Sequence, residues 1–194
     1  SADKAFELLQ EGNFRYASGD FKAANKKAAD RERLASGQAP HSIIVSCSDS
    51  RVPPEVIFDQ GLGDLFVVRN AGETVDQVAL GSIEYAVEHL GTNLIFVLGH
   101  ESCGAVKAAH STFGNKDAGS PALNKLVNLI QPNIKNFEGK SASQGYISEG
   151  TAQAKAVAAS LQGSKIIAER LSAGTLKIKV GMYLLHSGAV VTLN

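Results

Sequence analysis

Three consecutive stretches decide the fold: DLFVVR (64–69), TVDQVALGSIEYAVEHLG (74–91) and NLIFVLG (93–99). The first and third are short, β-branched and continuously apolar, which is typical of strands covered on both faces in a parallel sheet. Between them, apolar residues recur at helical spacing: Val75, Val78, Ile83, Ala86, Val87 and Leu90. Strand, helix and strand in this order predict a right-handed parallel crossover.

The flanking sequence extends this unit in both directions. SIIVS (42–46) predicts another buried strand, LKIKVGMYLL (176–185) a further strand, and GAVVTL (188–193) its hairpin partner. Helices are expected over about 103–113, 122–137 and 144–172, with a glycine-rich loop at 114–121. The pattern predicts an α/β fold, with a mostly parallel central sheet flanked by helices in a single domain spanning 1–194.

An N-terminal helical arm is expected over 1–36. Its first helix has Asp3 as a plausible N-cap and is broken at Gly19-Asp20. The second runs through KAANKKAADRERLAS (22–36) and is highly charged, with few large apolar residues. Such a helix suits a partner surface better than a core, so we expect the arm to pack on a partner subunit.

Composition disfavours a nucleic-acid-binding protein and effectively excludes a membrane protein. Lysine plus arginine equals aspartate plus glutamate, at 19 each, so no global charge favours nucleic acid. No apolar run approaches the roughly 20 residues that span a bilayer, so we expect no membrane span. Two cysteines allow at most one disulfide, a thin framework for a secreted scaffold. We expect a cytoplasmic location, or a periplasmic or exported one if a signal peptide has been removed.

Both cysteines lie in polar stretches that directly follow apolar strands, CSDSR (47–51) and HESC (100–103). If the strands are neighbours, Cys47, His100 and Cys103 meet in one crevice at the carboxyl end of the sheet, with Asp49 nearby. Either cysteine alone is more often a small buried hydrophobe, and the pair could also form a disulfide. Two thiolates and an imidazole nevertheless suit Zn²⁺, which makes a zinc site the leading interpretation.

Four stretches resemble the β-class carbonic anhydrases: CSDSRVPPE (47–55), GDLFVVRNAG (63–72), SIEYAVEHLG (82–91) and GHESCGAV (99–106). The resemblance is close over roughly 4–113 and looser beyond. It implies Cys47, His100 and Cys103 as zinc ligands, with a fourth position open to water. It also implies reversible hydration of CO2 to bicarbonate and a proton through a zinc-bound hydroxide, because catalytic zinc lowers the pKa of bound water to about 7.

The resemblance assigns further roles position by position. Asp49 and Arg51 would form a catalytic pair that orients the hydroxide, and in some members the Asp instead closes the site by binding zinc. The positions implied to bind substrate are Gln38, Phe66, Ala71, Tyr85 and Gly104, with Tyr85 reaching in from a second subunit. A homodimer, or a higher oligomer built from dimers, is therefore expected.

Some positions depart from the family pattern. Ala71 is smaller than the usual residue, which predicts a wider pocket, and Ala105 stands where many members have glycine. Ile44 and Ser46 replace the Trp and Gly of the bicarbonate-regulated subgroup. These two replacements argue for the standard type, which is open at neutral pH.

Two alternative functions stay open from the sequence. One is a hydrolase of COS or CS2 on the same scaffold, because the same ligands would serve those linear substrates. The other is a non-catalytic, zinc-stabilised or thiol-sensing binding module, in which Asp49 would be a permanent fourth ligand.

Overall fold

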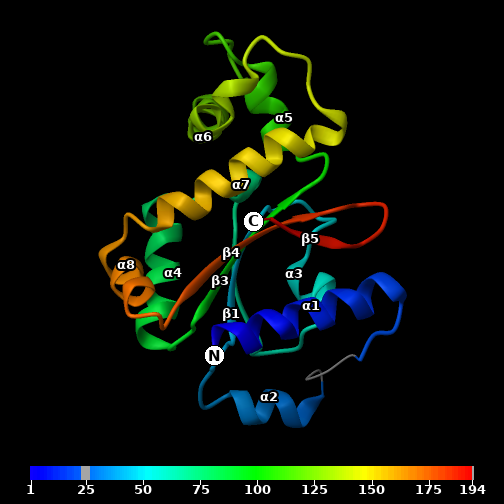
Figure 1. Ribbon diagram of the computed structural model, residues 1–194, viewed down its shortest axis with the longest axis vertical. Helices are drawn as coiled ribbons and strands as arrows, with labels where there is room; N and C mark the ends of the chain where they lie inside the picture. Colours follow the sequence, from blue (N-terminus) through cyan, green and yellow to red (C-terminus); the bar gives the residue numbers. More distant parts are fainter. Residues whose placement is uncertain (23–26, 194) are drawn as a thin grey trace.

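The computed structural model describes residues 1–22 and 27–193, and a five-stranded sheet forms its centre (Figure 1). The strands are β1 (Ser42–Ser46), β2 (Leu65–Arg69), β3 (Leu94–His100), β4 (Lys177–Tyr183) and β5 (Val190–Leu193). Their order is β2-β1-β3-β4-β5, and all neighbours are parallel except the β4–β5 hairpin. The predicted α/β fold with a mostly parallel sheet is confirmed.

Helices cover both faces of the sheet. In β1, Ile43 and Val45 pack toward α4 (Gln77–His89), α7 (Ile147–Leu161) and α8 (Lys165–Ser172). Ile44 faces the opposite cluster, which includes residues of α1 (Ala2–Ser18) and α3 (Pro54–Ile57) and the adjoining Phe58. β1 and β3 are buried along their whole length, which is why both read as continuous apolar runs.

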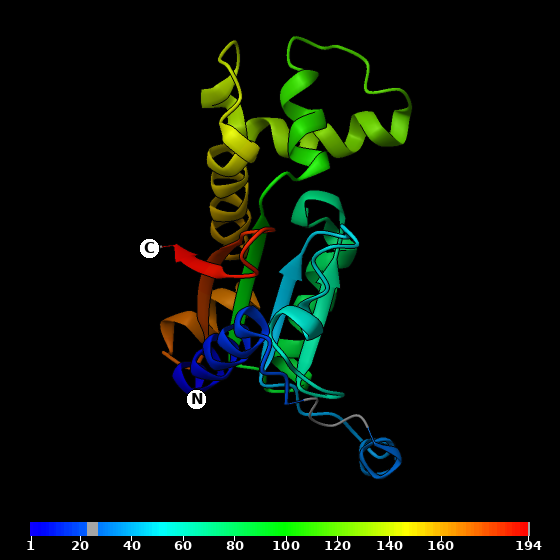
Figure 2. The same ribbon diagram turned by 90° about the vertical axis from the view of Figure 1, so that its right-hand side faces the viewer.

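The carboxyl ends of the parallel strands lie on one side of the molecule. α5 (Gly104–Ser111) and α6 (Pro121–Ile130) extend beyond that end, whereas α2 (Ala28–Leu34) lies at the opposite end (Figure 2). The chain passes from β1 to β2 and then over β1 to β3, so the strand order reverses next to β1. Open α/β sheets bind ligands at such a switch point, beyond the carboxyl ends of the strands.

Helix boundaries correct several predictions. Ser1, and not Asp3, caps α1, because its Oγ accepts from the Lys4 amide at 3.3 Å. The expected helix over 122–137 is α6 followed by a 3-10 helix, η2 (Gln131–Phe137), which has a proline in its first turn. The expected helix over 144–172 divides into a 3-10 turn, α7 and α8, since Ser164 caps a new helix after Gly163.

The two helices of the N-terminal arm behave differently. α1 buries Ala5 and Leu9 in the core of its own chain. α2 is shorter than expected, and each of its residues is exposed or half-buried. The start of the expected second helix, 23–26, lies outside the described residues. Within the described part of the chain, no helix combines the length and apolarity needed to cross a membrane.

Candidate metal centre

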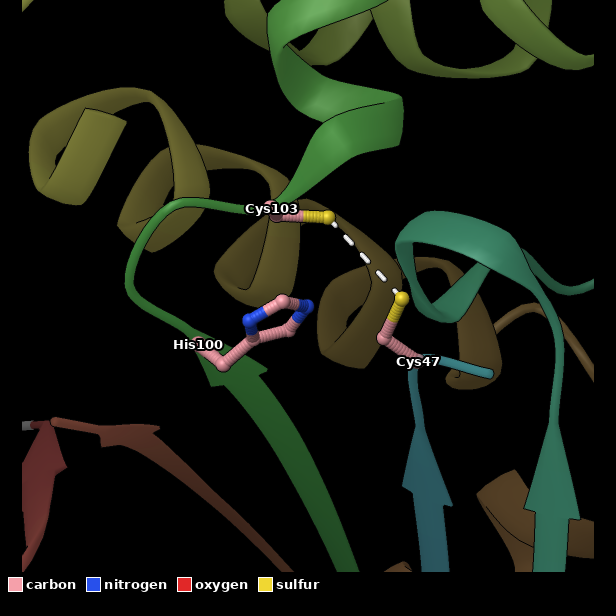
Figure 3. A group of neighbouring side chains, drawn as sticks. All are labelled: Cys47, His100 and Cys103. Carbon is pink, nitrogen blue, oxygen red and sulfur yellow. Dashed lines mark hydrogen bonds between the residues drawn. The ribbon is translucent and has the colours of Figure 1, made fainter. Parts of the chain in front are cut away.

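Three potential metal ligands converge at the carboxyl ends of the two central strands (Figure 3). Cys47 follows β1 directly, His100 ends β3, and Cys103 precedes α5. Because β1 and β3 pair in parallel, two segments 56 positions apart reach the same edge. All three side chains are buried, their ligand atoms lie within 4.8 Å of one another, and the two Sγ atoms are 3.9 Å apart.

The imidazole of His100 is oriented for coordination. Its Nδ1 is 2.8 Å from the Glu101 carbonyl oxygen, which can only accept, so Nδ1 carries the proton in the neutral ring. Nε2 is then a bare lone pair, and it is buried without a hydrogen-bond partner among the described residues. It points toward the two cysteine sulfurs (Figure 3). A buried acceptor left open in this way fits a metal ion, and a backbone partner on the other ring nitrogen is usual for a metal ligand.

The two thiols are not equivalent. The hydrogen bond between the two sulfurs lowers the pKa of Cys47 to about 4, against the effect of burial, and the Gly72 amide adds a bond to Cys47 Sγ at 3.3 Å. The same bond, together with burial, raises the pKa of Cys103. Both thiols would have to lose their protons to bind a metal ion, so metal binding would release protons from this pair.

The turn that joins β3 to α5 is held from two sides. Ser102 has a left-handed backbone, with φ of 57°, and its amide donates to the Gly145 carbonyl at 2.7 Å. The Glu101 amide donates to the Tyr183 carbonyl at 2.9 Å, and its carboxylate accepts from the Leu185 amide at 3.1 Å. Strained backbone of this kind persists only where neighbours over-determine it, and here it sets the positions of His100 and Cys103.

Asp49 and Arg51 form a bidentate ion pair beside this cluster. Arg51 Nε donates to Asp49 Oδ1 at 2.9 Å and Nη2 to Oδ2 at 2.7 Å, while the Arg51 amide also reaches Oδ1. These bonds lower the pKa of Asp49 to about 2. Both carboxylate oxygens of Asp49 thus bind Arg51, and Arg51 Nη2 also reaches the Ser102 carbonyl at 3.3 Å.

The predicted substrate residues fall into two groups. Ala71 and Gly104 adjoin the Cys–His–Cys cluster. Ala71 is next in sequence to Gly72, whose amide donates to Cys47 Sγ, and Gly104 directly follows Cys103. Open space surrounds Gly104, where an added Cβ would meet no described atom within 4 Å.

The other three substrate residues lie away from the cluster of their own chain. Gln38 precedes β1 at the amino end of the sheet, and β1 alone puts about 16 Å between that end and Cys47. Phe66 is in β2, three positions before the last residue of that strand, with its ring 6.5 Å from that of Tyr85. Tyr85 is on α4 and 49% exposed. The structure does not bring these side chains to Cys47 within one chain.

Sequence reasoning missed three residues near the site. Arg69 donates to the Cys47 carbonyl at 2.9 Å and to the Asp49 carbonyl at 2.6 Å, which ties β2 to the CSDSR stretch. Gly72 supplies the amide to Cys47. Glu73 is 1% exposed, its carboxylate oxygens have no partner among the described residues, and burial raises its pKa. The RNAGE stretch (69–73) that follows β2 was the available signal, since it ends at the same edge as Cys47.

The fold and the site define an open, mostly parallel sheet with a Cys–His–Cys group at the carboxyl ends of its central strands, a group that could hold one metal ion. The family described as Carbonic anhydrase matches residues 42–190. "Carbonic anhydrase 2" of Mycobacterium tuberculosis is 40% identical over 187 residues, covering 96% of this chain and 90% of that protein. The carbonic anhydrase of Mycolicibacterium smegmatis is also 40% identical, over 188 residues.

Solved structures agree. A tetrameric β-carbonic anhydrase of Sordaria macrospora superposes with a TM-score of 0.78 at 25% identity, over 98% of both chains. The Coccomyxa β-carbonic anhydrase gives 0.76 at 28% identity, over 95% of this chain and 84% of that one. The chain belongs to the β-class carbonic anhydrase family and is a lyase. These matches do not favour the COS/CS2 hydrolase or the non-catalytic binding module.

Proposed function

We propose that the protein catalyses the reversible hydration of CO2 to bicarbonate and a proton, with one Zn²⁺ held by Cys47, His100 and Cys103. The observation that carries the proposal is the bare, buried Nε2 of His100, which faces two cysteine sulfurs. Two sulfurs and one imidazole nitrogen form a donor set that suits Zn²⁺, whereas the harder Mg²⁺ and Ca²⁺ prefer oxygen ligands. When bound, zinc would act as a Lewis acid that lowers the pKa of a coordinated water to about 7.

The Asp49–Arg51 pair would orient the attacking water. With its pKa lowered to about 2, Asp49 is an acceptor-only carboxylate at any physiological pH. Because Arg51 binds both of its oxygens, Asp49 would be kept from binding the metal, and a fourth position would be left for water or substrate. We propose this open arrangement as the active form.

The substrate pocket would be completed by a second copy of the chain. Ala71 and Gly104 would line it from the metal-binding chain, whereas Gln38, Phe66 and Tyr85 are too far from their own Cys47 and would serve a neighbouring site. An assembly is in keeping with the tetrameric Sordaria macrospora relative. The chain would form a single domain over 1–194, with an N-terminal arm over 1–36 that packs on the partner subunit. α2 would contribute to this contact between subunits.

We also propose a cytoplasmic location, which suits two free, buried cysteines kept reduced for metal binding.

Metal analysis combined with stopped-flow CO2 hydration tests the proposed function. We expect about one zinc per chain, as a three-ligand site predicts, and a hydration rate that disappears when a chelator removes the metal and returns on adding zinc. A zinc-loaded protein that hydrates CO2 no faster than buffer would refute it.

A further inference from the structure

A buried glutamine is one residue away from the candidate metal centre, because it bonds to Gly72, which in turn bonds to Cys47. It has no role in the site as described so far. Gln153 is on α7 and is 0% exposed. Its Nε2 donates to the Gly72 carbonyl at 2.9 Å, and its Oε1 accepts from Asn133 Nδ2 at 2.8 Å. A buried amide is costly unless its groups are bonded, and here both ends of the amide have a partner.

The orientation of this amide follows from its partners. The Gly72 carbonyl oxygen can only accept a hydrogen bond, so the Gln153 atom facing it must be the NH2 group. The other end must therefore present the oxygen, which matches the Asn133 amide that donates to it. Gln153 thus connects η2 and α7 to the turn after β2, a segment 81 positions away in sequence.

The turn after β2, to which Gln153 donates a hydrogen bond, is strained and closely packed. Gly72 has φ of 65° and Glu73 has φ of 42°, so two consecutive residues are left-handed and the second is not glycine. A Cβ at position 72 would lie 2.8 Å from Ile130 Cδ1, so the backbone packs closely against α6. Such a turn needs outside contacts to keep its shape, and Gln153 holds the carbonyl of its central residue.

The same glycine carries the contact to the metal centre. The Gly72 amide donates to Cys47 Sγ at 3.3 Å, and the carbonyl of the same residue accepts from Gln153. We propose that Gln153 is a positioning residue, which aims the Gly72 N–H at the sulfur of Cys47 and thereby sets how strongly that thiolate binds the metal. This inference rests on the proposed zinc site.

The expected consequence follows from the position of the sulfur. An N–H donor orients the lone pairs of a thiolate and fixes the ligand where the metal would bind. Loss of an outer partner of this kind typically costs roughly 10- to 100-fold in metal affinity. Without Gln153, the strained turn can relax and the N–H is no longer held toward Cys47.

Cadmium in place of zinc makes the contact directly observable. In the unaltered protein loaded with ¹¹³Cd²⁺, we expect a scalar coupling between the metal and the Gly72 amide proton, transmitted through the N–H···S bond to Cys47. In Co²⁺-loaded protein, the sulfur-to-metal charge-transfer band reports the charge on the same sulfur.

The variant Gln153→Met keeps the length of the side chain and removes both hydrogen bonds. We expect it to lose the Gly72 coupling, shift the charge-transfer band and bind zinc roughly 10- to 100-fold more weakly in a chelator competition. Val157→Ala is the matched control, because Val157 is 5% exposed on the same helix and packs in the other core cluster. The control should lower the free energy of unfolding but keep the coupling, the band and the zinc affinity.

Several outcomes would overturn the inference. Absence of the Gly72 coupling in the unaltered cadmium protein would do so even if Gln153→Met failed to fold. So would a folded Gln153→Met protein with an unchanged band and affinity, or a Val157→Ala protein that changes both equally. Failure of the unaltered protein and all variants to bind zinc or cadmium is a different result, which refutes the proposed metal site and this inference with it.

Discussion

Two regions of the molecule differ in whether one chain brings their candidate site residues together. One is the carboxyl end of the sheet, and the other contains Gln38, Phe66 and Tyr85. At the carboxyl end, three buried ligand atoms lie within 4.8 Å of one another. The other three residues are spread from the amino end of the sheet to the exposed surface of α4. The difference teaches that strand pairing and the turn after β3 bring three potential metal ligands together within one chain but leave Gln38, Phe66 and Tyr85 apart.

Removing one metal ligand should give the largest effect. In Cys47→Ser, we expect zinc content to fall to near zero and CO2 hydration to fall to the rate of buffer, because Ser is a poor ligand for zinc. Metal analysis and stopped-flow hydration measure both. Ser46→Ala is the control, since its buried Oγ has no partner among the described residues and should be dispensable. A fully active Cys47→Ser protein would contradict the metal site.

The next largest effect is expected at the Asp49–Arg51 pair. Asp49→Asn keeps the shape of the side chain but removes the charge, so hydration should fall by roughly 10²- to 10⁴-fold while the zinc content is unchanged. The control is the same substitution at Asp117, an exposed aspartate in the loop before α6. Loss of zinc together with activity would instead place Asp49 in the metal site itself.

A mixing experiment tests whether the second region acts on a neighbouring site. Gln38→Ala should lower hydration about 10-fold, the value of one hydrogen bond to the reacting species. Co-assembly with the inactive Cys47→Ser chain should then raise activity per zinc, because each hybrid pairs an intact metal site with an intact Gln38. If Gln38 served its own chain, mixing would restore nothing.

The smallest effect should come from a site that belongs to neither region. Ser164 caps α8 through the Ile167 amide and donates to Glu84 at 2.6 Å. Ser164→Ala should lower the free energy of unfolding by about 1 kcal/mol, the usual cost of losing an N-cap, and leave zinc affinity unchanged. Denaturant unfolding and chelator competition measure the two quantities. A fall in zinc affinity would contradict this expectation, because it would mean that the stability of α8 affects the metal site.

Features encoded by local pattern were predictable from the sequence. Apolar runs located β1, β2 and β3, and the polar residues after β1 and β3 identified Cys47, His100 and Cys103. The break before Ser164 was missed because the alanine-rich stretch around it favours helix on both sides. Gln153 and Glu73 were missed because their partners are distant in sequence, and nothing in the neighbouring residues marks a buried amide or carboxyl group.

The 56-position separation of the two cysteines has a consequence for folding. The site exists only when β1 and β3 are paired, so the unfolded chain offers an ion no comparable group of ligands. By mass action, an ion present at 100 times its dissociation constant would stabilise the folded chain by about 2.7 kcal/mol. The melting temperature should therefore rise with free zinc and fall with a chelator, which would make the ion a cofactor for folding as well as for the proposed reaction.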